Sequence, residues 1–422
     1  MGKLQPARGT RDIVGDEARR MRRVEEAFRE AGHLYGFEEL TTPIFEFTEV
    51  FARPLGESSD IVSKEMYTFE DRGGAGLTLR PEFTAGVCRA FISGGMQQSL
   101  PQRLMSSGPA FRYERPQKGR YRQFHQVNAE LIGDHDPMAD VDMIVMAWRF
   151  LKALGLGDAV TLHLNTLGDH DSRRTYREAL VAYLARHRDA LSPDSQRRLD
   201  SNPLRILDSK DEGDRALLAD APRLADSLND HSRAFFDRVT AGLTAAGVPY
   251  ELDPHLVRGM DYYTHTAFEF VTDTLGAQGT VLGGGRYDGL VKQLGGPDVP
   301  GIGWAAGMER LALMLEDGSD QAVRAVVMPM DDDSQAYGVQ VAETLRDLGL
   351  VVTSDRSGNM GKRLNRANRA GARYAAIIGS NERDAGQVSL KDLASGTQET
   401  LPLVEIAERL GDGGDQRAGG VA

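Results

Sequence analysis

Cysteine is nearly absent from this chain, and long apolar runs are absent altogether. Among 422 residues only Cys88 is a cysteine, which excludes an intrachain disulfide and any zinc or iron–sulfur site built from several cysteines. No apolar run approaches the roughly 18 residues that a membrane span needs. The opening residues, MGKLQPARGTRD, lack the apolar segment of a secretory signal. We therefore expect a reduced, cytoplasmic protein with no membrane partner.

Basic residues are outnumbered in the chain as a whole. It has 50 Lys and Arg against 62 Asp and Glu, a net charge of −12, which argues against non-specific binding to nucleic acid. Two stretches instead have more basic than acidic residues. Residues 112–122 contain five Lys or Arg with one acid, and residues 356–381 contain six with none. Each stretch is either a solvated surface or a place that meets phosphate.

The first two thirds of the chain mix helical and strand patterns. Apolar spacing predicts a helix over 16–34, and alternation predicts strands over 40–50, 76–80, 105–115 and 123–132. The 123–132 strand would place Phe124, Gln126, Asn128 and Glu130 on one face, either as a solvated face or as the floor of a polar pocket. From about residue 171 to 247 the pattern turns helical between strand-like segments, which indicates a helical insertion.

The last quarter of the chain has a different organisation. Apolar segments at 324–330, 351–355 and 372–379 are expected as strands, with helices over 334–348 and 362–370. Strands that alternate with helices at this spacing are typical of a small parallel α/β domain. We thus predict a first domain over 1–320 that contains the insertion, a second over 321–410, and a disordered tail over 411–422.

Arginines recur beside aromatic and glycine-rich segments. FRYERPQKGRYRQFHQ (111–126) has the form of two strands joined by a short loop, with arginines near Phe124. Arg310 follows the small-residue run GIGWAAG, and Arg258 lies in LVRGMDYYT. Each arginine alone is more typical of a surface or an ion pair. Several that converge would suit a polyphosphate, because phosphoryl chemistry needs fixed cations.

Two carboxylates and a glycine cluster are further candidates. Glu82, in LRPEFTAG, and Glu130 could each bind an ammonium or an imidazole, or serve only as structural carboxylates. The cluster GGGRYDG (283–289) has neither the GK[ST] of a P-loop nor a GxGxxG that opens a helix, so both nucleotide-loop interpretations fail. It is either a tight turn or a place where the backbone approaches a ligand closely.

Five segments, in order, carry a family resemblance. GFEELTTPIFEF (36–47), FRYERPQKGRYRQFHQVNAELIG (111–133) and GIGWAAGMERL (301–311) are similar to motifs 1, 2 and 3 of class II aminoacyl-tRNA synthetases. LVRGMDYYT (256–264) and GGGRYDG resemble stretches specific to the histidine enzyme. The chain thus resembles the histidyl-tRNA synthetase family over nearly its full length. The resemblance implies an α+β fold, with a class II antiparallel sheet flanked by helices, a helical insertion and a C-terminal α/β anticodon-binding domain.

The same resemblance implies a ligase. Family members activate L-histidine with ATP to histidyl-adenylate and transfer histidine to the 3′-terminal adenosine of tRNA(His). Mg²⁺ is expected on the ATP phosphates, with no metal site of the protein's own, and motif 1 implies a homodimer.

Roles follow by resemblance for four sets of residues. The catalytic set is Arg112, Arg258 and Arg310. The histidine-binding set is Glu82, Thr84, Gln126, Glu130, Arg258, Tyr262, Tyr263 and Tyr287. The ATP-binding set is Arg112, Phe124, Gln126 and Arg310. The tRNA-binding set is Arg115, Gln117 and Lys118 in the motif 2 loop, with Lys362, Arg363 and Arg366 in the basic stretch near the C-terminus.

Two non-catalytic interpretations compete with this one. A histidine-sensing regulatory paralogue of a phosphoribosyltransferase generally lacks the C-terminal domain and departs from LVRGMDYYT, whereas this chain keeps both. A synthetase-like sensor of uncharged tRNA would normally be fused to a kinase and would have lost the phosphate-binding arginines, and neither applies here.

Overall fold

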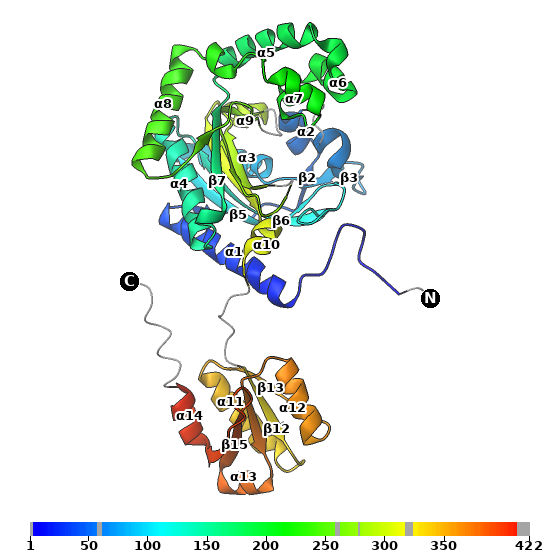
Figure 1. Cartoon of the computed structure of the whole chain (residues 1–422), viewed down its shortest axis with the longest axis vertical. Coiled ribbons are helices and arrows are strands. Elements are labelled where there is room, and N and C mark those ends of the chain that lie inside the picture. The colour runs from blue at the N-terminus through cyan, green and yellow to red at the C-terminus, as the bar shows by residue number, and fades with distance from the viewer. Residues whose placement is uncertain (1–2, 57–60, 258–261, 277–278, 317–323, 412–422) are drawn as a thin grey trace. The chain divides into compact units, whose positions relative to one another are not determined.

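The computed structural model describes residues 3–56, 61–257, 262–276, 279–316 and 324–411. The chain forms two compact units, Met1–Asp317 and Gly318–Ala422 (Figure 1). The tail expected after residue 410 lies, apart from Gly411, outside the described residues. No helix in the described ranges is long and apolar enough to cross a membrane.

An eight-stranded sheet organises the first unit. Its order is β1 (Glu38–Glu39), β5 (Gln102–Phe111), β6 (Gln123–Ile132), β11 (Gly301–Gly307), β10 (Thr280–Arg286), β9 (Thr264–Val271), β7 (Thr161–Thr166) and β8 (Glu251–Leu252). The six inner strands pair antiparallel, and only the two short edge strands pair parallel. The predicted antiparallel sheet is confirmed. It supplies a rigid floor on which side chains from distant segments meet.

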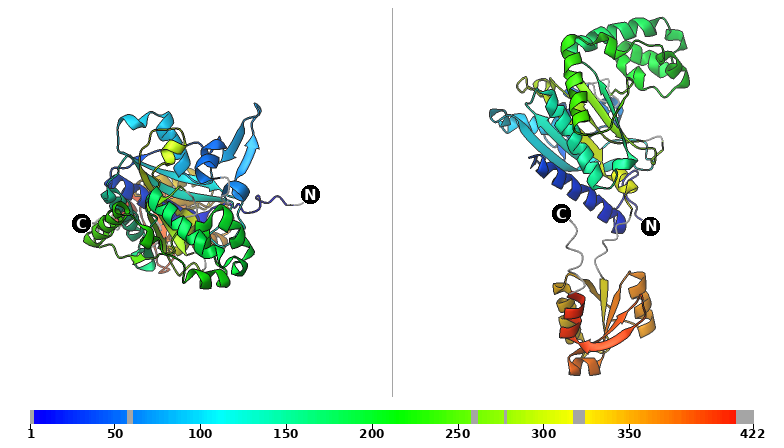
Figure 2. Two further views of the ribbon diagram at one scale, coloured as in Figure 1. Left: turned by 90° about the horizontal axis from the view of Figure 1, so that it is seen from above. Right: turned by 60° about the vertical axis from the view of Figure 1, so that its left-hand side comes forward.

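Four helices, three of them long, cover one face of this sheet. They are α1 (Gly15–Leu34), α4 (Pro137–Ala153), α8 (Asp230–Ala245) and α10 (Met308–Met314), as Figures 1 and 2 show. Helix α4 begins where Asp136 accepts from Met138 N at 2.9 Å, with Pro137 in the first turn. An aromatic cluster fills the interface, and its members Phe28 and Trp304 have ring centroids 5.6 Å apart.

A smaller antiparallel sheet lies beside the main one. It pairs β2 (Phe45–Phe47), β4 (Gly76–Leu79) and β3 (Tyr67–Glu70), with α2 (Glu49–Leu55) after β2. The strand expected over 40–50 is therefore confined to three residues, since Pro43 cannot donate to a ladder and helix α2 begins at Glu49. Helices α3 (Thr84–Ser93) and α9 (Leu290–Gln293) pack together next to it.

The predicted insertion contains α5 (His170–Ala185), α6 (Pro193–Ser201) and α7 (Glu212–Leu218). These helices bury a core of their own that includes Tyr176, Leu180 and Ile206. Helix α8 falls inside the predicted range too, yet its buried side chains join the core beneath the large sheet. The last helix of this segment therefore ties it to the sheet.

The second unit holds a mixed sheet in the order β13 (Val351–Ser354), β12 (Arg324–Pro329), β14 (Tyr374–Ile378), β15 (Gln387–Asp392) and β16 (Gln398–Pro402). Its helices are α11 (Gln335–Asp347), α12 (Met360–Arg369), α13 (Ser380–Ala385) and α14 (Leu403–Gly411). The first three strands are parallel as predicted, but β15 and β16 add an antiparallel hairpin. The expectation of a purely parallel sheet is wrong, because the polar, exposed β16 carries no apolar pattern.

Candidate active site

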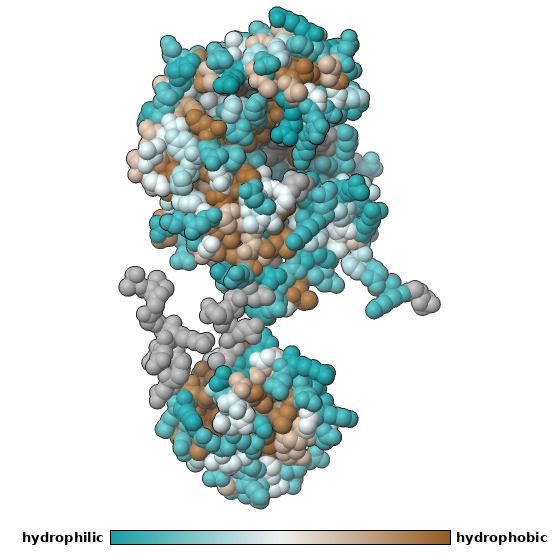
Figure 3. Space-filling view, in the orientation of Figure 1, coloured by the Kyte–Doolittle hydropathy of each residue, from teal (hydrophilic) through white to brown (hydrophobic). Residues whose placement is uncertain are grey.

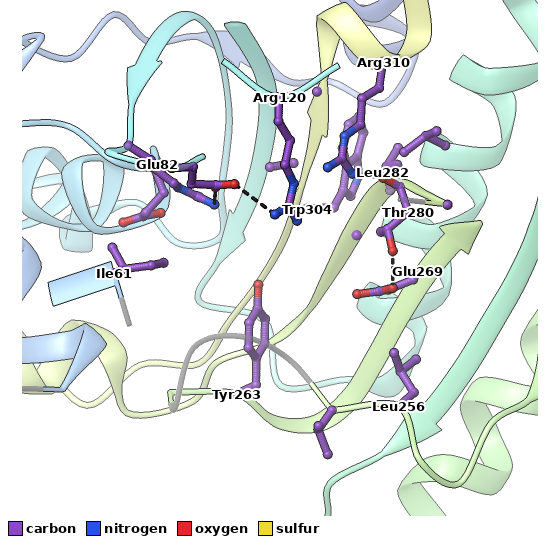
Figure 4. A pocket seen from close by; sticks show the side chains of 18 of the residues that line it. Ile61, Glu82, Arg120, Leu256, Tyr263, Glu269, Thr280, Leu282, Trp304 and Arg310 are labelled. Carbon is purple, nitrogen blue, oxygen red and sulfur yellow. Dashed lines mark hydrogen bonds and ion pairs between the residues drawn. The ribbon is translucent and has the colours of Figure 1, made fainter. Parts of the chain in front are cut away.

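A cavity of about 890 Å³ opens over the large sheet. Strands β6, β9, β10 and β11 form one wall, and the insertion contributes another through residues 205–219. The space-filling view in Figure 3 shows this face hollowed below the insertion, with hydrophilic side chains around the hollow. In Figure 4, the Tyr263 hydroxyl points into the cavity between Glu82 and Glu269, while Arg120 and Arg310 enter from the other side.

Glu82 lies just before the N-terminus of helix α3, which begins at Thr84. Its Oε2 accepts from Thr84 N at 2.5 Å and its Oε1 from Ala85 N at 2.9 Å, so it takes the capping role. Burial raises the pKa of Glu82, and these backbone hydrogen bonds oppose the shift. Each carboxylate oxygen keeps a further lone pair, and Glu82 lines the cavity. The carboxylate is thus held rigidly while it can still accept from a ligand.

Glu130 lies fully buried behind Thr84. Its Oε1 accepts from Thr84 Oγ1 at 2.5 Å and Asn128 Nδ2 at 3.0 Å, and its Oε2 from Tyr287 Oη at 2.6 Å. Burial raises its pKa to about 7, although the three donors pull the pKa down. A Cβ at position 303 would lie 1.7 Å from Glu130 Oε2, so the glycine there makes room for the carboxylate.

Three tyrosines pack around this carboxylate. The Tyr262 ring lies 4.7 Å from the Tyr263 ring and 6.0 Å from the Tyr287 ring, between centroids. Tyr263 lines the cavity, whereas Tyr262 and Tyr287 lie behind it in the core. Burial raises the pKa of both inner tyrosines, so they stay protonated and can donate. Arg258, predicted for this end of the cavity, lies outside the described residues.

Arginines gather at the opposite end of the cavity. Arg112 follows strand β5, and its Nε donates to Pro81 O at 2.8 Å while its Cζ lies 5.4 Å from the Phe124 ring centroid. Arg310 of α10 donates to Thr280 O. Burial lowers the pKa of Arg310, and the nearby charges of Arg120 and Arg112 lower it further. This end of the cavity therefore gathers three guanidinium groups, with the carboxylate of Glu114 paired to Arg120 at 3.0 Å beside them.

Gln126 and Phe124 lie on the β6 face as the alternation predicts, and both line the cavity. Gln126 Oε1 is buried, with no hydrogen-bond partner among the described residues. Such an oxygen suits a ligand donor. The loop residues Arg115, Gln117 and Lys118 lie exposed outside the cavity lining.

Several cavity residues escaped the sequence analysis. Glu269 accepts from Thr280 Oγ1 at 2.7 Å on the cavity wall, and its one signal was a charge inside the apolar run AFEFV. Arg205, Lys210 and Arg215 reach the same cavity from the insertion. Their mixed-charge surroundings in sequence gave no indication of this placement.

Comparisons with known proteins agree with this geometry. Residues 9–311 match the histidyl-tRNA synthetase family, and residues 324–412 match an anticodon-binding domain. A relative from Rhodospirillum rubrum named Histidine--tRNA ligase is 58% identical over 97% of this chain and 99% of its own length. The chain belongs to the histidyl-tRNA synthetase family.

Other members support the same assignment. A Histidine--tRNA ligase of Gluconobacter oxydans is 54% identical over 98% of this chain and all of its own length. The apo histidyl-tRNA synthetase of S. aureus superposes with a TM-score of 0.80 at 35% identity, covering 97% of this chain and all of that one. The regulatory paralogue is not favoured, because these full-length relatives include the anticodon-binding domain.

The anticodon-binding unit corrects one electrostatic interpretation. The stretch 356–381 has six cations and no acid of its own, but three of these cations have an acidic partner from outside the stretch. Arg363 is 2% exposed and donates to Asp355 O. Arg366 donates from Nε to Asp355 Oδ2 at 2.8 Å and from Nη2 to Asp355 Oδ1 at 2.7 Å. Arg373 Nη2 pairs with Asp392 Oδ2 at 2.7 Å. The acids lie just before and well after the stretch in sequence, so a local count misses them.

The remaining cations of this stretch have different surroundings. Lys362 and Arg369, both on α12, are exposed and have no ion-pair partner among the described residues. Arg356 is exposed and donates to Gln335 Oε1 at 3.1 Å. The positive surface of this unit therefore rests on side chains other than Arg363 and Arg366.

Proposed function

We propose that this chain is an ATP-dependent ligase that activates L-histidine to histidyl-adenylate and then transfers histidine to the 3′-terminal adenosine of tRNA(His). The observation that carries this proposal is one cavity with two chemically different ends. Glu82 and Tyr263 line one end, with Glu130 buried behind them, and arginines held by backbone carbonyls line the other. An amino acid and a nucleoside triphosphate would meet between them.

In the first step the histidine carboxylate attacks the α-phosphorus of ATP, and pyrophosphate leaves. Negative charge builds on the phosphate oxygens, and fixed guanidinium groups stabilise it by several kcal/mol in total. Arg112 would hold the α-phosphate, while Arg310 would contact the adenine and the terminal phosphates, with Phe124 on the other adenine face. Arg258 is proposed as a further cation at the α-phosphate. No side-chain nucleophile is required.

Histidine recognition falls to the carboxylate end. Glu82, Thr84 and Gln126 would surround the α-ammonium, with the unpartnered Gln126 Oε1 as one acceptor. Glu130 and Tyr263 would bracket the two imidazole nitrogens, the ring entering beside the Thr84 hydroxyl. Rejection of apolar amino acids then follows, because they would leave buried polar groups unmatched. Tyr262 and Tyr287 would act from behind, by packing Tyr263 and holding Glu130.

ATP would arrive with Mg²⁺ on its phosphates. Hard cations of this kind prefer oxygen ligands. Glu269 suits this role, because Thr280 links its carboxylate to Arg310 at the phosphate end of the cavity. The ion would neutralise charge on the terminal phosphates, while the arginines act on the α-phosphate.

Transfer RNA would contact both units. The exposed motif 2 loop, with Arg115, Gln117 and Lys118, would meet the acceptor end. In the anticodon-binding unit, Lys362 would contact phosphate together with its exposed helix neighbour Arg369. Arg363 and Arg366 would serve indirectly, by holding the loop after β13 through Asp355.

We further propose a cytoplasmic homodimer. Phe45, Phe47 and Phe69 are 45% to 61% exposed on the small sheet, and two of them lie in the motif 1 segment. Exposed aromatic side chains of this kind mark protein contacts, and a second copy of the chain is the proposed partner.

The direct test is histidine-dependent exchange of labelled pyrophosphate into ATP, without tRNA, with the other amino acids as controls. Exchange with histidine alone is the expected result. Absence of exchange from folded protein that still binds histidine would contradict the proposal and favour the regulatory paralogue.

A further inference from the structure

The first helix of the insertion reaches the histidine end of the cavity. Arg173, in the first turn of α5, donates from Nη1 to the backbone oxygen of Tyr263 at 2.9 Å. Tyr263 is the tyrosine whose side chain lines the cavity, and it directly precedes strand β9 (Figure 4). Arg173 itself is not part of the cavity lining. A charged donor on a carbonyl is among the stronger hydrogen bonds, so the contact is suited to fixing the backbone there.

The start of α5 is a firm support for this arginine. Asp169 accepts from Ser172 N at 2.8 Å and from Asn229 Nδ2 at 2.7 Å, and Asn229 N donates to Ser172 Oγ at 3.1 Å. Asn229 in turn caps α8 by accepting from Ser232 N at 2.8 Å. The N-termini of the two helices are thereby joined. Because α8 packs into the core beneath the sheet, the base of Arg173 is tied to that core.

The Tyr263 ring is confined from other directions. A Cβ at Gly285 would come within 2.9 Å of Tyr263 Cδ1, so the ring lies directly against the β10 backbone. The Tyr262 ring packs 4.7 Å away, between centroids. With the ring confined by its neighbours, the position of its hydroxyl depends on where the backbone at residue 263 is held. Arg173 holds this backbone through its hydrogen bond to the Tyr263 oxygen.

We propose that Arg173 is a positioning residue for histidine binding, which acts by placing the Tyr263 hydroxyl and makes no contact with histidine itself. The proposal rests on the histidine-binding role proposed for Tyr263. It gives the insertion a function at the amino-acid end of the cavity, in addition to the wall that its residues 205–219 provide. A preformed position for the hydroxyl saves the cost of ordering it when histidine binds.

Steady-state pyrophosphate exchange by full-length variants tests this inference. Arg173→Met removes the donor and keeps the apolar stem. We expect it to raise KM for histidine about tenfold, and KM for ATP less than about twofold, because only the tyrosine is displaced. Arg173→Lys should restore most of the affinity, since an ammonium can donate to the same carbonyl. Arg174→Met is the matched control, because Arg174 is 67% exposed and its ion-pair partner among the described residues is Asp171 in the same turn.

A double-variant cycle separates this inference from the function on which it rests. In a Tyr263→Phe background, Arg173→Met should change KM for histidine less than about twofold, because the hydroxyl it positions is gone. Equal rises in both KM values, or full additivity with Tyr263→Phe, would overturn the inference. If Tyr263→Phe left KM for histidine unchanged, the proposed role of Tyr263 would fail instead. Should Arg173→Met not fold, Arg173→Leu, which also lacks a donor, replaces it in the cycle.

Discussion

The two basic regions of this chain look alike in sequence and differ in how their arginines are held. In the catalytic unit, Arg112 and Arg310 donate to the backbone carbonyls of Pro81 and Thr280, and the carboxylate of Glu114 lies 3.9 Å from Arg112. In the anticodon-binding unit, Arg366 forms an ion pair with the carboxylate of Asp355, and Arg373 forms one with the carboxylate of Asp392. A carbonyl orients a guanidinium without cancelling its charge, whereas a carboxylate does both.

The acidic groups show the same contrast. Burial raises the pKa of Glu82 and of Glu130, which both accept hydrogen bonds from neutral donors, and the charge of Arg112 opposes the shift at Glu82. The hydrogen bonds from Arg366 lower the pKa of Asp355. The anticodon-binding unit thus uses direct hydrogen bonds between arginine and carboxylate to stabilise its own loops. In the cavity, Arg112 and Arg310 are oriented by backbone carbonyls, and Glu114 pairs with Arg120 at 3.0 Å.

The largest expected effect is on Arg310. Arg310→Met should lower kcat/KM for pyrophosphate exchange about a hundredfold or more, as expected when one fixed donor to developing charge is lost. Arg373→Met, which removes the same charge from a carboxylate pair in the other unit, should change it less than about twofold. A similar loss in both variants would mean that net charge, and not the way the arginine is held, matters.

The next prediction concerns pH and Glu130. Its pKa is about 7 in the folded chain against an ordinary 4.5, so between these values the folded chain keeps a proton that the unfolded chain has released. Stability therefore falls as pH rises through this window. Glu130→Gln removes the titrating group and should gain thermal stability relative to the unmodified chain from pH 5 to pH 8. A constant difference in Tm across that range would contradict the assignment.

A smaller effect is expected at Asp355. Its pKa is lowered, so it contributes stability that is lost only as pH falls below its ordinary value of 3.8. Asp355→Asn should speed hydrogen exchange of the β12 and β13 amides roughly tenfold at pH 7, because the buried Arg363 loses its neighbouring carboxylate. Asp332→Asn is the matched control, since Asp332 is exposed in the same unit. Equal protection in both variants would contradict the structural role of Asp355.

The smallest expected effect is on tRNA binding, and it distinguishes the exposed cations of the anticodon-binding unit from those paired with carboxylates. Replacing Lys362 and Arg369 together with Ala should raise KM for tRNA(His) several-fold and lower the salt slope of tRNA binding by about 1 to 2, with pyrophosphate exchange unchanged. Arg366→Ala should lower the salt slope of tRNA binding by less than the double variant does. A larger drop for Arg366→Ala would show that its pair with Asp355 opens when tRNA binds.

Local sequence patterns predicted much of the fold. Strand β6 has the predicted bounds of Gln123 and Ile132, and helix α1 begins one residue before the predicted Asp16. Helix α1 buries one regular face, which periodicity reports directly, whereas β6 is buried on both faces from Val127 to Ile132. The hairpin of β15 and β16 was missed because its outer strand is almost wholly exposed.

The site depends on contacts that no local pattern contains. Tyr287 and Gly303 shape the surroundings of Glu130 from segments far from it in sequence, and only the folded sheet brings them there. Asp355 and Asp392 neutralise arginines from outside the basic stretch. Resemblance supplied the roles of the cavity residues, which stay predictions until variants are assayed. It did not indicate Glu269 or Arg173, whose placement needed the structure.

The measurement that tests this contrast most directly is tRNA-free, histidine-dependent pyrophosphate exchange by Arg112→Met beside Arg366→Met, under identical conditions. Both variants remove one guanidinium. We expect the exchange rate to fall about a hundredfold or more for Arg112→Met and less than about twofold for Arg366→Met. Comparable rates for the two variants would contradict this expectation.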